Sequence, residues 1–199
     1  SRLTVETWGN ISVRDPETQW IYVTPSAMSY DTCREDDIVV CGSDGSILEG
    51  SRKPTIEKDL HLAIYRERPR VNAVIHTHPI YSTVFACTRT TIPPVIDEAA
   101  QVLGGVVHVA NYALPGSPEL ASNCVKALGA EANACLLQSH GAVCLGKDMA
   151  AAFKVATVLE MTAEIYLLTL QAGKKPVPIA ESDVKAMQDF AENHYGQGK

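Results

Sequence analysis

Short β-prone runs alternate with helical segments along the chain, and this alternation restricts the fold more than any other feature. Strands are expected where β-branched and aromatic residues cluster between turn residues, at 11–14, 20–23, 38–41, 73–75, 106–109 and 135–137. Helices are expected where apolar residues recur every three or four positions, at 54–68, 80–87, 117–128, 149–171 and 181–193. No repeat or low-complexity linker interrupts the alternation. We therefore predict one α/β domain over residues 1–199, in which 181–199 form a C-terminal helix and tail.

The charge and hydropathy of the chain argue against two classes of partner. The formal net charge is −6, whereas a nucleic-acid surface needs a basic face. No run approaches the roughly 20 apolar residues that cross a bilayer, and the first residues lack the pattern of a secretion signal. We expect a cytoplasmic protein that binds neither nucleic acid nor a membrane. The six cysteines form no C-x-x-C pair and are expected to remain thiols.

A His-Thr-His sequence at 76–78 follows a short apolar run. In an extended chain alternate residues point to the same side, so both imidazoles can converge on one ion. Catalytic zinc sites typically use three protein ligands, and His140 is the best candidate for the third because it precedes a flexible glycine, Gly141. Less well placed are His61, His108 and His194. Buried histidines are also typical of a hydrogen-bonded core, and the pattern alone leaves both interpretations open.

Two acidic positions are candidates for proton transfer beside a metal. Glu57 lies in the first turn of the helix expected from Pro54, on an otherwise apolar face. The helix dipole also favours an acidic residue there, so an ordinary surface position is equally typical. The rival pair, Asp97 and Glu98, could transfer a proton, begin a helix or orient a metal-bound histidine.

Five ordered motifs resemble the class II aldolase/adducin family, whose members include fuculose-phosphate and rhamnulose-phosphate aldolases. They are Gly9-Asn10-Ile11-Ser12, Thr24-Pro25-Ser26-Ala27, Lys53-Pro54-Thr55-Ile56-Glu57, His76-Thr77-His78 and Gln138-Ser139-His140-Gly141. The resemblance implies a three-layer α/β fold with a central, mostly antiparallel sheet flanked by helices. It also implies a homotetramer with the active site at a subunit interface. The family's opening helix is expected to be missing from this chain.

The resemblance also implies roles for individual residues. The metal ligands would be His76, His78 and His140, holding zinc, with manganese or cobalt as alternatives. Glu57 matches the catalytic glutamate, and Tyr195 matches a tyrosine that handles the aldehyde. The phosphate-binding positions would be Gly9, Asn10, Ser26, Ala27, Thr55 and Ile56. The implied reaction cleaves a ketose 1-phosphate, or a related short sugar, to dihydroxyacetone phosphate and an aldehyde through a metal-stabilised enediolate.

Three departures from the family pattern leave the substrate open. Ala27 replaces a common glycine, Ile56 replaces a common serine, and Asp97 replaces a tyrosine of fuculose-phosphate aldolase. Alternative functions are therefore a dehydratase or decarboxylase of a sugar or oxo-acid phosphate on the same scaffold. A non-catalytic binding protein like adducin is disfavoured, because the three histidines and Glu57 are all present.

Overall fold

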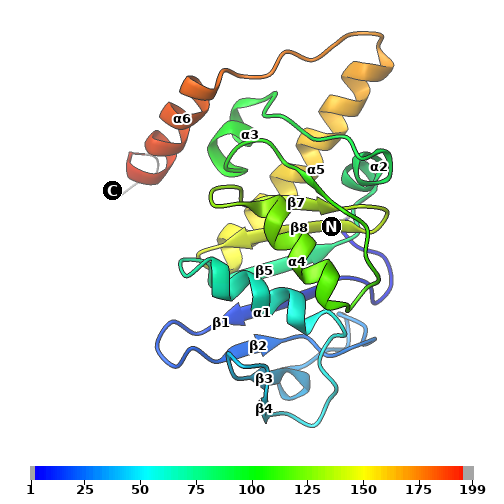
Figure 1. Cartoon of the computed structure of the whole chain (residues 1–199), viewed down its shortest axis with the longest axis vertical. Helices are drawn as coiled ribbons and strands as arrows, with labels where there is room; N and C mark the ends of the chain where they lie inside the picture. The colour runs from blue at the N-terminus through cyan, green and yellow to red at the C-terminus, as the bar shows by residue number, and fades with distance from the viewer. Residues whose placement is uncertain (1–2, 195–199) are drawn as a thin grey trace.

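The computed structural model describes residues 3–194 of the chain (Figure 1). Its strands are β1 (Asn10–Arg14), β2 (Ile21–Val23), β3 (Val39–Cys41), β4 (Ile47–Glu49), β5 (Ala73–Thr77), β6 (Val109–Ala110), β7 (Ala134–Leu137) and β8 (Gly141–Gly146). Its α-helices are α1 (Lys58–Glu67), α2 (Ile80–Thr88), α3 (Asp97–Val102), α4 (Pro118–Leu128), α5 (Met149–Gln171) and α6 (Glu181–Asn193), and one 3-10 helix, η1, spans Glu35–Asp37.

The strands form one sheet in the order β4-β3-β2-β1-β5-β8-β7-β6. Neighbouring strands run antiparallel except β6 and β7, which are parallel. Helices α1 and α4 cover one face of the sheet, and α2 and α5 cover the other. The predicted three-layer α/β fold with a mostly antiparallel sheet is confirmed.

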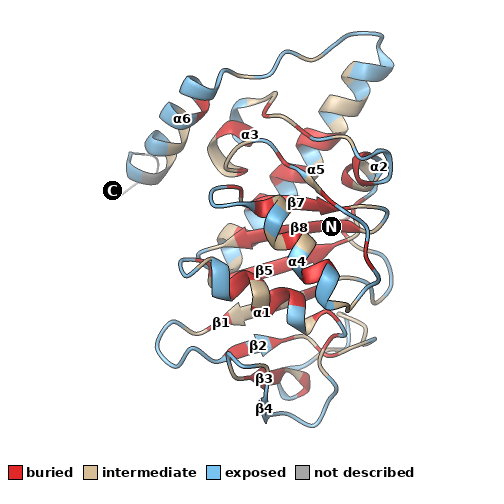
Figure 2. Cartoon of the chain, viewed as in Figure 1, coloured by how far each residue is buried: buried red, intermediate tan, exposed pale blue. Residues whose placement is uncertain are grey.

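The middle of the sheet is buried on both faces (Figure 2). In β7, Cys135 and Leu137 pack toward α1 and α4, whereas Ala134 and Leu136 pack toward α5. Side chains of β8 alternate in the same way. Strands buried on both sides carry continuous apolar runs rather than an alternating pattern. This explains why 135–137 is readable as a strand from sequence alone.

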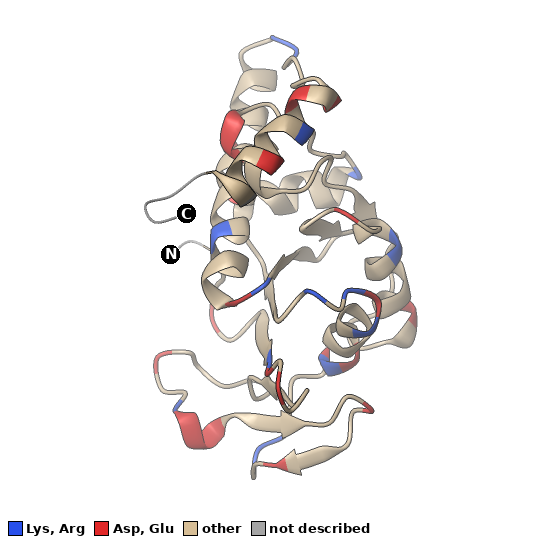
Figure 3. Ribbon diagram, turned by 90° about the vertical axis from the view of Figure 1, so that its left-hand side faces the viewer, with Lys and Arg blue, Asp and Glu red and all other residues tan. Residues whose placement is uncertain are grey.

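The long helix predicted at 149–171 is confirmed by α5. It begins where the Asp148 side chain accepts a hydrogen bond from the Ala151 N–H, 2.7 Å away, as an N-cap should. Among residues 3–194, no helix combines the length and hydrophobicity needed to span a bilayer. Acidic and basic residues are interspersed along the side of the molecule drawn in Figure 3, without a continuous basic stripe.

Several predicted boundaries are wrong. The strand expected at 106–109 is shorter, because β6 holds only Val109–Ala110 and Val107 forms an isolated bridge with Ile92. Strands β4 and β8 and helix α3 lie outside the predicted elements. For β8 the reason is physical: the short apolar run 142–145 has the same pattern in a strand as in a buried helical segment.

The helix expected from Pro54 begins later, at Lys58. Pro54 is held in an isolated bridge with Pro25, so the backbone stays extended at that point. Glu57 is consequently the N-cap residue of α1 and does not lie in its first turn. The side chain of an N-cap residue projects from the end of a helix, and here the Glu57 side chain lies against His76 of β5.

Candidate metal centre

The structure brings the three predicted metal ligands together at one end of the central strands. His76 lies in β5, His78 follows it directly, and His140 lies in the turn between β7 and β8. Because β5 pairs with β8, with Thr77 opposite Ala142, that turn lies beside the end of β5. The Nε2 atom of His76 is 2.9 Å from that of His78 and 3.3 Å from that of His140.

This arrangement fits a divalent metal ion. The His76 Nδ1 atom lies 2.9 Å from the carbonyl oxygen of Ala142, which can only accept a hydrogen bond. The proton of a neutral His76 ring is therefore on Nδ1, and the lone pair of Nε2 faces the other two rings. Ligand nitrogens about 2.0–2.1 Å from a tetrahedral zinc would be roughly 3.4 Å apart. The distances from His76 Nε2 to the other two Nε2 atoms are close to that value, and the ligand atoms of all three residues lie within 4.8 Å of one another.

Burial keeps these rings in the protonation state that a metal requires. Desolvation, followed by the neighbouring His140 and His78, lowers the pKa of His76 well below its ordinary value. Desolvation also lowers the pKa of His78 and of His140. Only neutral imidazole can donate its lone pair to a metal, so all three side chains are available at neutral pH.

Glu57 faces the three imidazoles from the end of α1. Its Oε2 atom is 3.3 Å from His76 Nε2, and its Oε1 atom is 3.6 Å from His140 Nε2. Only 5% of the residue is exposed, so the alternative of an ordinary surface position is wrong. Oε2 accepts a hydrogen bond from Asn10 Nδ2 at 2.8 Å, whereas Oε1 has no hydrogen-bond partner among the described residues. A carboxylate oxygen with free acceptor capacity thus lies next to the proposed metal position.

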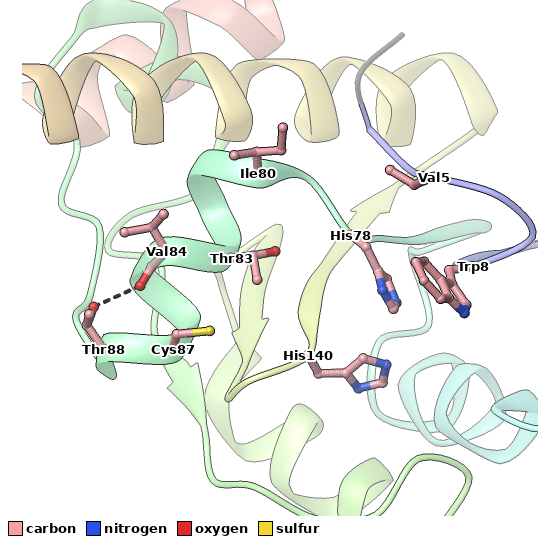
Figure 4. Close-up of a pocket in the computed structure, with 9 residues that line it drawn as sticks. All are labelled: Val5, Trp8, His78, Ile80, Thr83, Val84, Cys87, Thr88 and His140. Atoms are coloured by element: carbon pink, nitrogen blue, oxygen red, sulfur yellow. Dashed lines mark hydrogen bonds between the residues drawn. The ribbon is translucent and has the colours of Figure 1, made fainter.

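An apolar cavity of about 520 Å³ opens beside His78 and His140. Figure 4 shows helix α2 on one side of it and Trp8 on the other, with Thr83 and Cys87 turned toward the two histidines. The Trp8 ring is stacked on His78, with ring centroids 6.2 Å apart. The lining residues are Val5, Trp8, His78, Ile80, Thr83, Val84, Cys87, Thr88 and His140.

Residues 1–167 match the family model of the Class II Aldolase and Adducin N-terminal domain. The chain belongs to the class II aldolase and adducin family.

Named relatives within this family are aldolases. A 5-deoxy-D-ribulose 1-phosphate aldolase of Bacillus thuringiensis serovar kurstaki is 33% identical over 199 residues, covering 100% of this chain and 91% of that protein. A 5-methylthioribulose-1-phosphate/5-deoxyribulose-1-phosphate aldolase of Rhodospirillum rubrum is 35% identical over 184 residues, covering 92% of this chain and 81% of that protein. A solved L-fuculose 1-phosphate aldolase has a TM-score of 0.91 at 37% identity, covering 96% of this chain and 88% of that chain. The prediction that the chain belongs with the class II lyases is confirmed.

In this class II aldolase fold the predicted phosphate-binding segments lie close to one another. The N–H of Ser26 donates to the carbonyl of Lys53 at 2.9 Å, and the N–H of Thr55 donates to Thr24 at 3.1 Å. These two backbone donors are therefore already used. Ala27, at the position where the family commonly has glycine, adopts a left-handed backbone conformation with φ of 54°. Its backbone thus keeps a conformation that glycine favours, despite the added methyl group.

The other phosphate-binding candidates are placed differently. Gly9 has φ of 80°, and a Cβ there would lie 2.5 Å from the carbonyl oxygen of His76, so the position requires glycine. Asn10 lies opposite His76 in the β1–β5 pairing, and its side chain binds Glu57 instead of facing an open loop. Ile56 is 65% exposed. Its side chain offers no hydrogen bond to a ligand.

Two groups of predicted residues are not placed beside the three histidines by the described structure. Asp97 and Glu98 are exposed at the start of α3, and neither is hydrogen-bonded to His76, His78 or His140 among the described residues. Support of the histidines by this pair is therefore not observed. Tyr195 lies outside the described residues 3–194.

His61, which is less well placed than His140 as a metal ligand, nevertheless lies in the site region. It is 1% exposed, and its Nε2 atom contacts Asn10 Oδ1 at 2.5 Å. Burial, and then the nearby His76, lower its pKa to about 3, so the ring is neutral. His61 follows Glu57 by one helical turn, so both residues lie on the same side of α1. That spacing was visible in the sequence.

Gly141 is required by the close packing of the ligands. A Cβ at this position would collide with the carbonyl oxygen of Thr77 and would lie 3.1 Å from His78 Cδ2 and 3.3 Å from His76 Cε1. We expect Gly141→Ala to destabilise the fold by about 1–3 kcal/mol, as overpacking does. We also expect metal affinity to fall by about 10- to 100-fold, because the supporting contacts of two ligands shift. Denaturant unfolding and metal titration measure the two effects.

Gly129→Ala is the matched control for that substitution. Gly129 has φ of 57°, and a Cβ there would meet no atom within 4 Å. The variant should lose about 1–2 kcal/mol through backbone strain and keep the metal affinity of the parent. If Gly141→Ala lost stability but also kept its metal affinity, the packing of this glycine would not matter to the site.

Proposed function

We propose that the chain is a divalent-metal-dependent aldolase that cleaves a ketose 1-phosphate, or a related short sugar, to dihydroxyacetone phosphate and an aldehyde. The observation that carries this proposal is the free Oε1 atom of Glu57 beside three converging imidazole nitrogens. A carbon–carbon lyase needs a cation to stabilise negative charge and a base or acid to move one proton. Three imidazoles that would hold a cation and a carboxylate that would move the proton lie within a few ångströms of one another. The names of the relatives support the same reaction.

His76, His78 and His140 would hold the metal, and we propose zinc, with manganese or cobalt as alternatives. Three neutral imidazoles with an open fourth position are typical of catalytic zinc. When bound, the cation would polarise the substrate carbonyl and offset the negative charge that develops as the carbon–carbon bond breaks. Glu57 would then give a proton to the carbon that held the broken bond, or remove that proton in the direction of synthesis.

The substrate phosphate is proposed to lie at Gly9, Asn10, Ser26, Ala27, Thr55 and Ile56. Support comes from the short contacts between these segments and from the hydroxyl of Thr55. The Thr55 Oγ1 atom accepts a hydrogen bond from the N–H of Glu57 at 3.3 Å, so its own proton is free to be donated to an anion. Asn10 would act on the phosphate only indirectly, because its side chain is bound to Glu57 and His61.

The aldehyde half of the substrate is proposed to end in an apolar group such as a methyl or a thioether. The cavity beside His78 and His140 is lined largely by apolar side chains, with Val84 and Trp8 among them. Thr83 Oγ1 is buried there without a hydrogen-bond partner among the described residues, and it can bind a single substrate hydroxyl. Two relatives are named for substrates with a deoxy or methylthio end.

A panel of ketose 1-phosphates, assayed for release of dihydroxyacetone phosphate with and without a chelator, tests the proposal. We expect chelator-sensitive release, with kcat/KM for a 5-deoxy or 5-methylthio substrate about 10- to 200-fold above that for the 5-hydroxy analogue. If dihydroxyacetone phosphate is released equally well from every substrate, the apolar cavity does not select the aldehyde. If metal-loaded protein releases no ketone from any of them, the dehydratase or decarboxylase alternative replaces this proposal.

We also propose that the chain forms a homotetramer with active sites between subunits. Helix α5 exposes large apolar side chains along its length, including Phe153 at 49% and Leu168 at 52% exposure. A partner subunit would cover such a surface. The cavity beside His140 is open to one side and could be closed by the same contact.

A further inference from the structure

A chain of buried hydrogen bonds connects Glu57 to the interior between α1 and the sheet. Asn10 Nδ2 is 2.8 Å from Glu57 Oε2, and Asn10 Oδ1 is 2.5 Å from His61 Nε2. Beyond the ring, His61 Nδ1 is 2.6 Å from Ser12 Oγ, which is 2.7 Å from Tyr65 Oη. At most 5% of any of these residues is exposed. We call these five side chains the Glu57 network.

The carboxylate at the Glu57 end of the network determines the direction of every hydrogen bond in it. An ionised Glu57 can only accept, so Asn10 turns its NH₂ group toward Oε2 and its carbonyl oxygen toward His61. That carbonyl can only accept, so the single proton of a neutral His61 is on Nε2. The unprotonated Nδ1 then accepts from the hydroxyl of Ser12, which in turn accepts from the hydroxyl of Tyr65. Each hydrogen bond in the network thus has one donor and one acceptor.

The opposite arrangement would place an acceptor against Glu57. With its proton on Nδ1, His61 would accept from the NH₂ group of Asn10, and the Asn10 carbonyl oxygen would face the carboxylate. Two oxygen acceptors at that distance in a buried site repel each other, and the group left without a partner costs about 1–3 kcal/mol. The tautomer of His61 therefore decides whether Asn10 supplies Glu57 with a donor or with an acceptor.

The two oxygens of Glu57 are consequently different. Oε2 is occupied by the Asn10 donor, and a proton placed on it would meet a hydrogen already directed at it. Oε1 has no hydrogen-bond partner among the described residues, and it lies 3.6 Å from His140 Nε2. A proton taken from substrate carbon is accommodated on Oε1 without rearranging the network.

We propose that His61 is a positioning residue that fixes the Asn10 amide, so that Glu57 exchanges its proton with substrate through Oε1. This inference rests on the proposed aldolase function. In the direction of synthesis, the carbon–hydrogen bond of the ketone breaks, its proton passes to Oε1, and its electron pair stays on the substrate. His61 never touches the substrate in this scheme. Its effect on the reaction is transmitted entirely through Asn10.

Solvent deuterium exchange into dihydroxyacetone phosphate isolates this step, because it needs no aldehyde. In His61→Phe the Asn10 amide loses its anchor, and we expect the maximal exchange rate to fall by about 10- to 100-fold with little change in KM. A metal-loaded His61→Phe protein that exchanges deuterium at the parent rate would overturn the inference.

Two amide variants preserve the test even where His61→Phe does not fold. The terminal nitrogen of a glutamine lies near the position of histidine Nε2, whereas that of an asparagine lies near Nδ1. We expect His61→Gln to retain most of the exchange rate and His61→Asn to lose it. Equal exchange rates in His61→Gln and His61→Asn would contradict the proposal that His61 acts through Asn10.

Thr162→Val is the matched control for a lost buried hydrogen bond. Thr162 Oγ1 donates to the Val158 carbonyl oxygen at 2.7 Å within α5, and the residue is fully buried. This variant should be less stable than the parent protein. Its exchange rate should remain unchanged, because the Glu57 network is intact. A comparable fall in the exchange rate of Thr162→Val would show that the His61 effect comes from lost stability, and would overturn the inference.

Nitrogen NMR of ¹⁵N-histidine-labelled protein provides a readout that does not depend on activity. The inference expects a protonated Nε2 and an unprotonated Nδ1 for His61, assigned by the loss of its signal in His61→Gln. The opposite tautomer would refute it. If the parent protein releases no ketone and exchanges no deuterium, the proposed function fails, whereas the NMR result still tests the orientation of the network.

Discussion

Glu57→Gln is expected to lower the turnover of ketose 1-phosphate by about 10²- to 10⁴-fold, the usual contribution of a positioned acid or base. The amide has nearly the same shape as the carboxylate and can still accept the hydrogen bond from Asn10 Nδ2. It cannot take up or release the proton. Metal content and the free energy of unfolding should stay close to those of the parent protein. Steady-state kinetics combined with metal analysis of the same preparation measures this.

Glu98→Gln is the matched control, since it makes the same chemical change at the rival acidic pair. Glu98 is exposed at the start of α3 and forms no hydrogen bond to the three histidines among the described residues. Turnover should remain near that of the parent protein. Near-normal turnover in Glu57→Gln, or a large loss in Glu98→Gln, would remove Glu57 from the mechanism.

His140→Ala is expected to lower metal affinity by more than about 100-fold. Loss of a contact that only supports a ligand lowers metal affinity by about 10- to 100-fold. His140 is the most suitable of the three ligands to remove. Its Nδ1 atom has no hydrogen-bond partner among the described residues, so no buried group is left unsatisfied. His76→Ala would instead also remove a buried hydrogen bond to the Ala142 carbonyl oxygen. Metal analysis after dialysis and the change in Tm on adding zinc give two independent measurements.

His108→Ala serves as the control for that experiment. His108 is exposed and does not belong to the converging group of His76, His78 and His140. Its removal should leave bound metal and the zinc-induced rise in Tm unchanged, because the stabilisation reflects metal binding to the folded state alone. Unchanged metal content in His140→Ala would show that the ligand set is wrong.

The sequence predicts the layers of the fold better than it predicts the ends of its elements. The helix at 149–171 is long and apolar enough for both of its ends to be predicted at the observed residues. The segment 135–137 is recognisable as a buried strand. Strand β8 is missed because a four-residue apolar run has no distinctive period. The late start of α1 depends on the bridge between Pro25 and Pro54, a contact between distant segments that local propensity does not contain.

In the candidate site, too, the sequence predicts some features and not others. The three histidines are predictable because each follows an apolar run and the ordered motifs match a family. The direction in which the Asn10 side chain points cannot be predicted from the sequence. It depends on His61 and Glu57, which approach β1 from α1 and its N-cap. The family resemblance implies phosphate binding at Asn10, and the structure shows its side chain hydrogen-bonded to the Glu57 carboxylate. A polar residue in a buried strand indicates a partner without identifying it.

The separation of the proposed ligands along the chain restricts when an ion can bind during folding. His76 and His140 are 64 residues apart and meet only because β5 and β8 pair. Before that pairing, an ion finds only the two histidines of the His-Thr-His segment, and closing the intervening loop costs entropy. An ion bound to all three histidines would stabilise the pairing of β5 with β8, and would therefore be expected to slow unfolding.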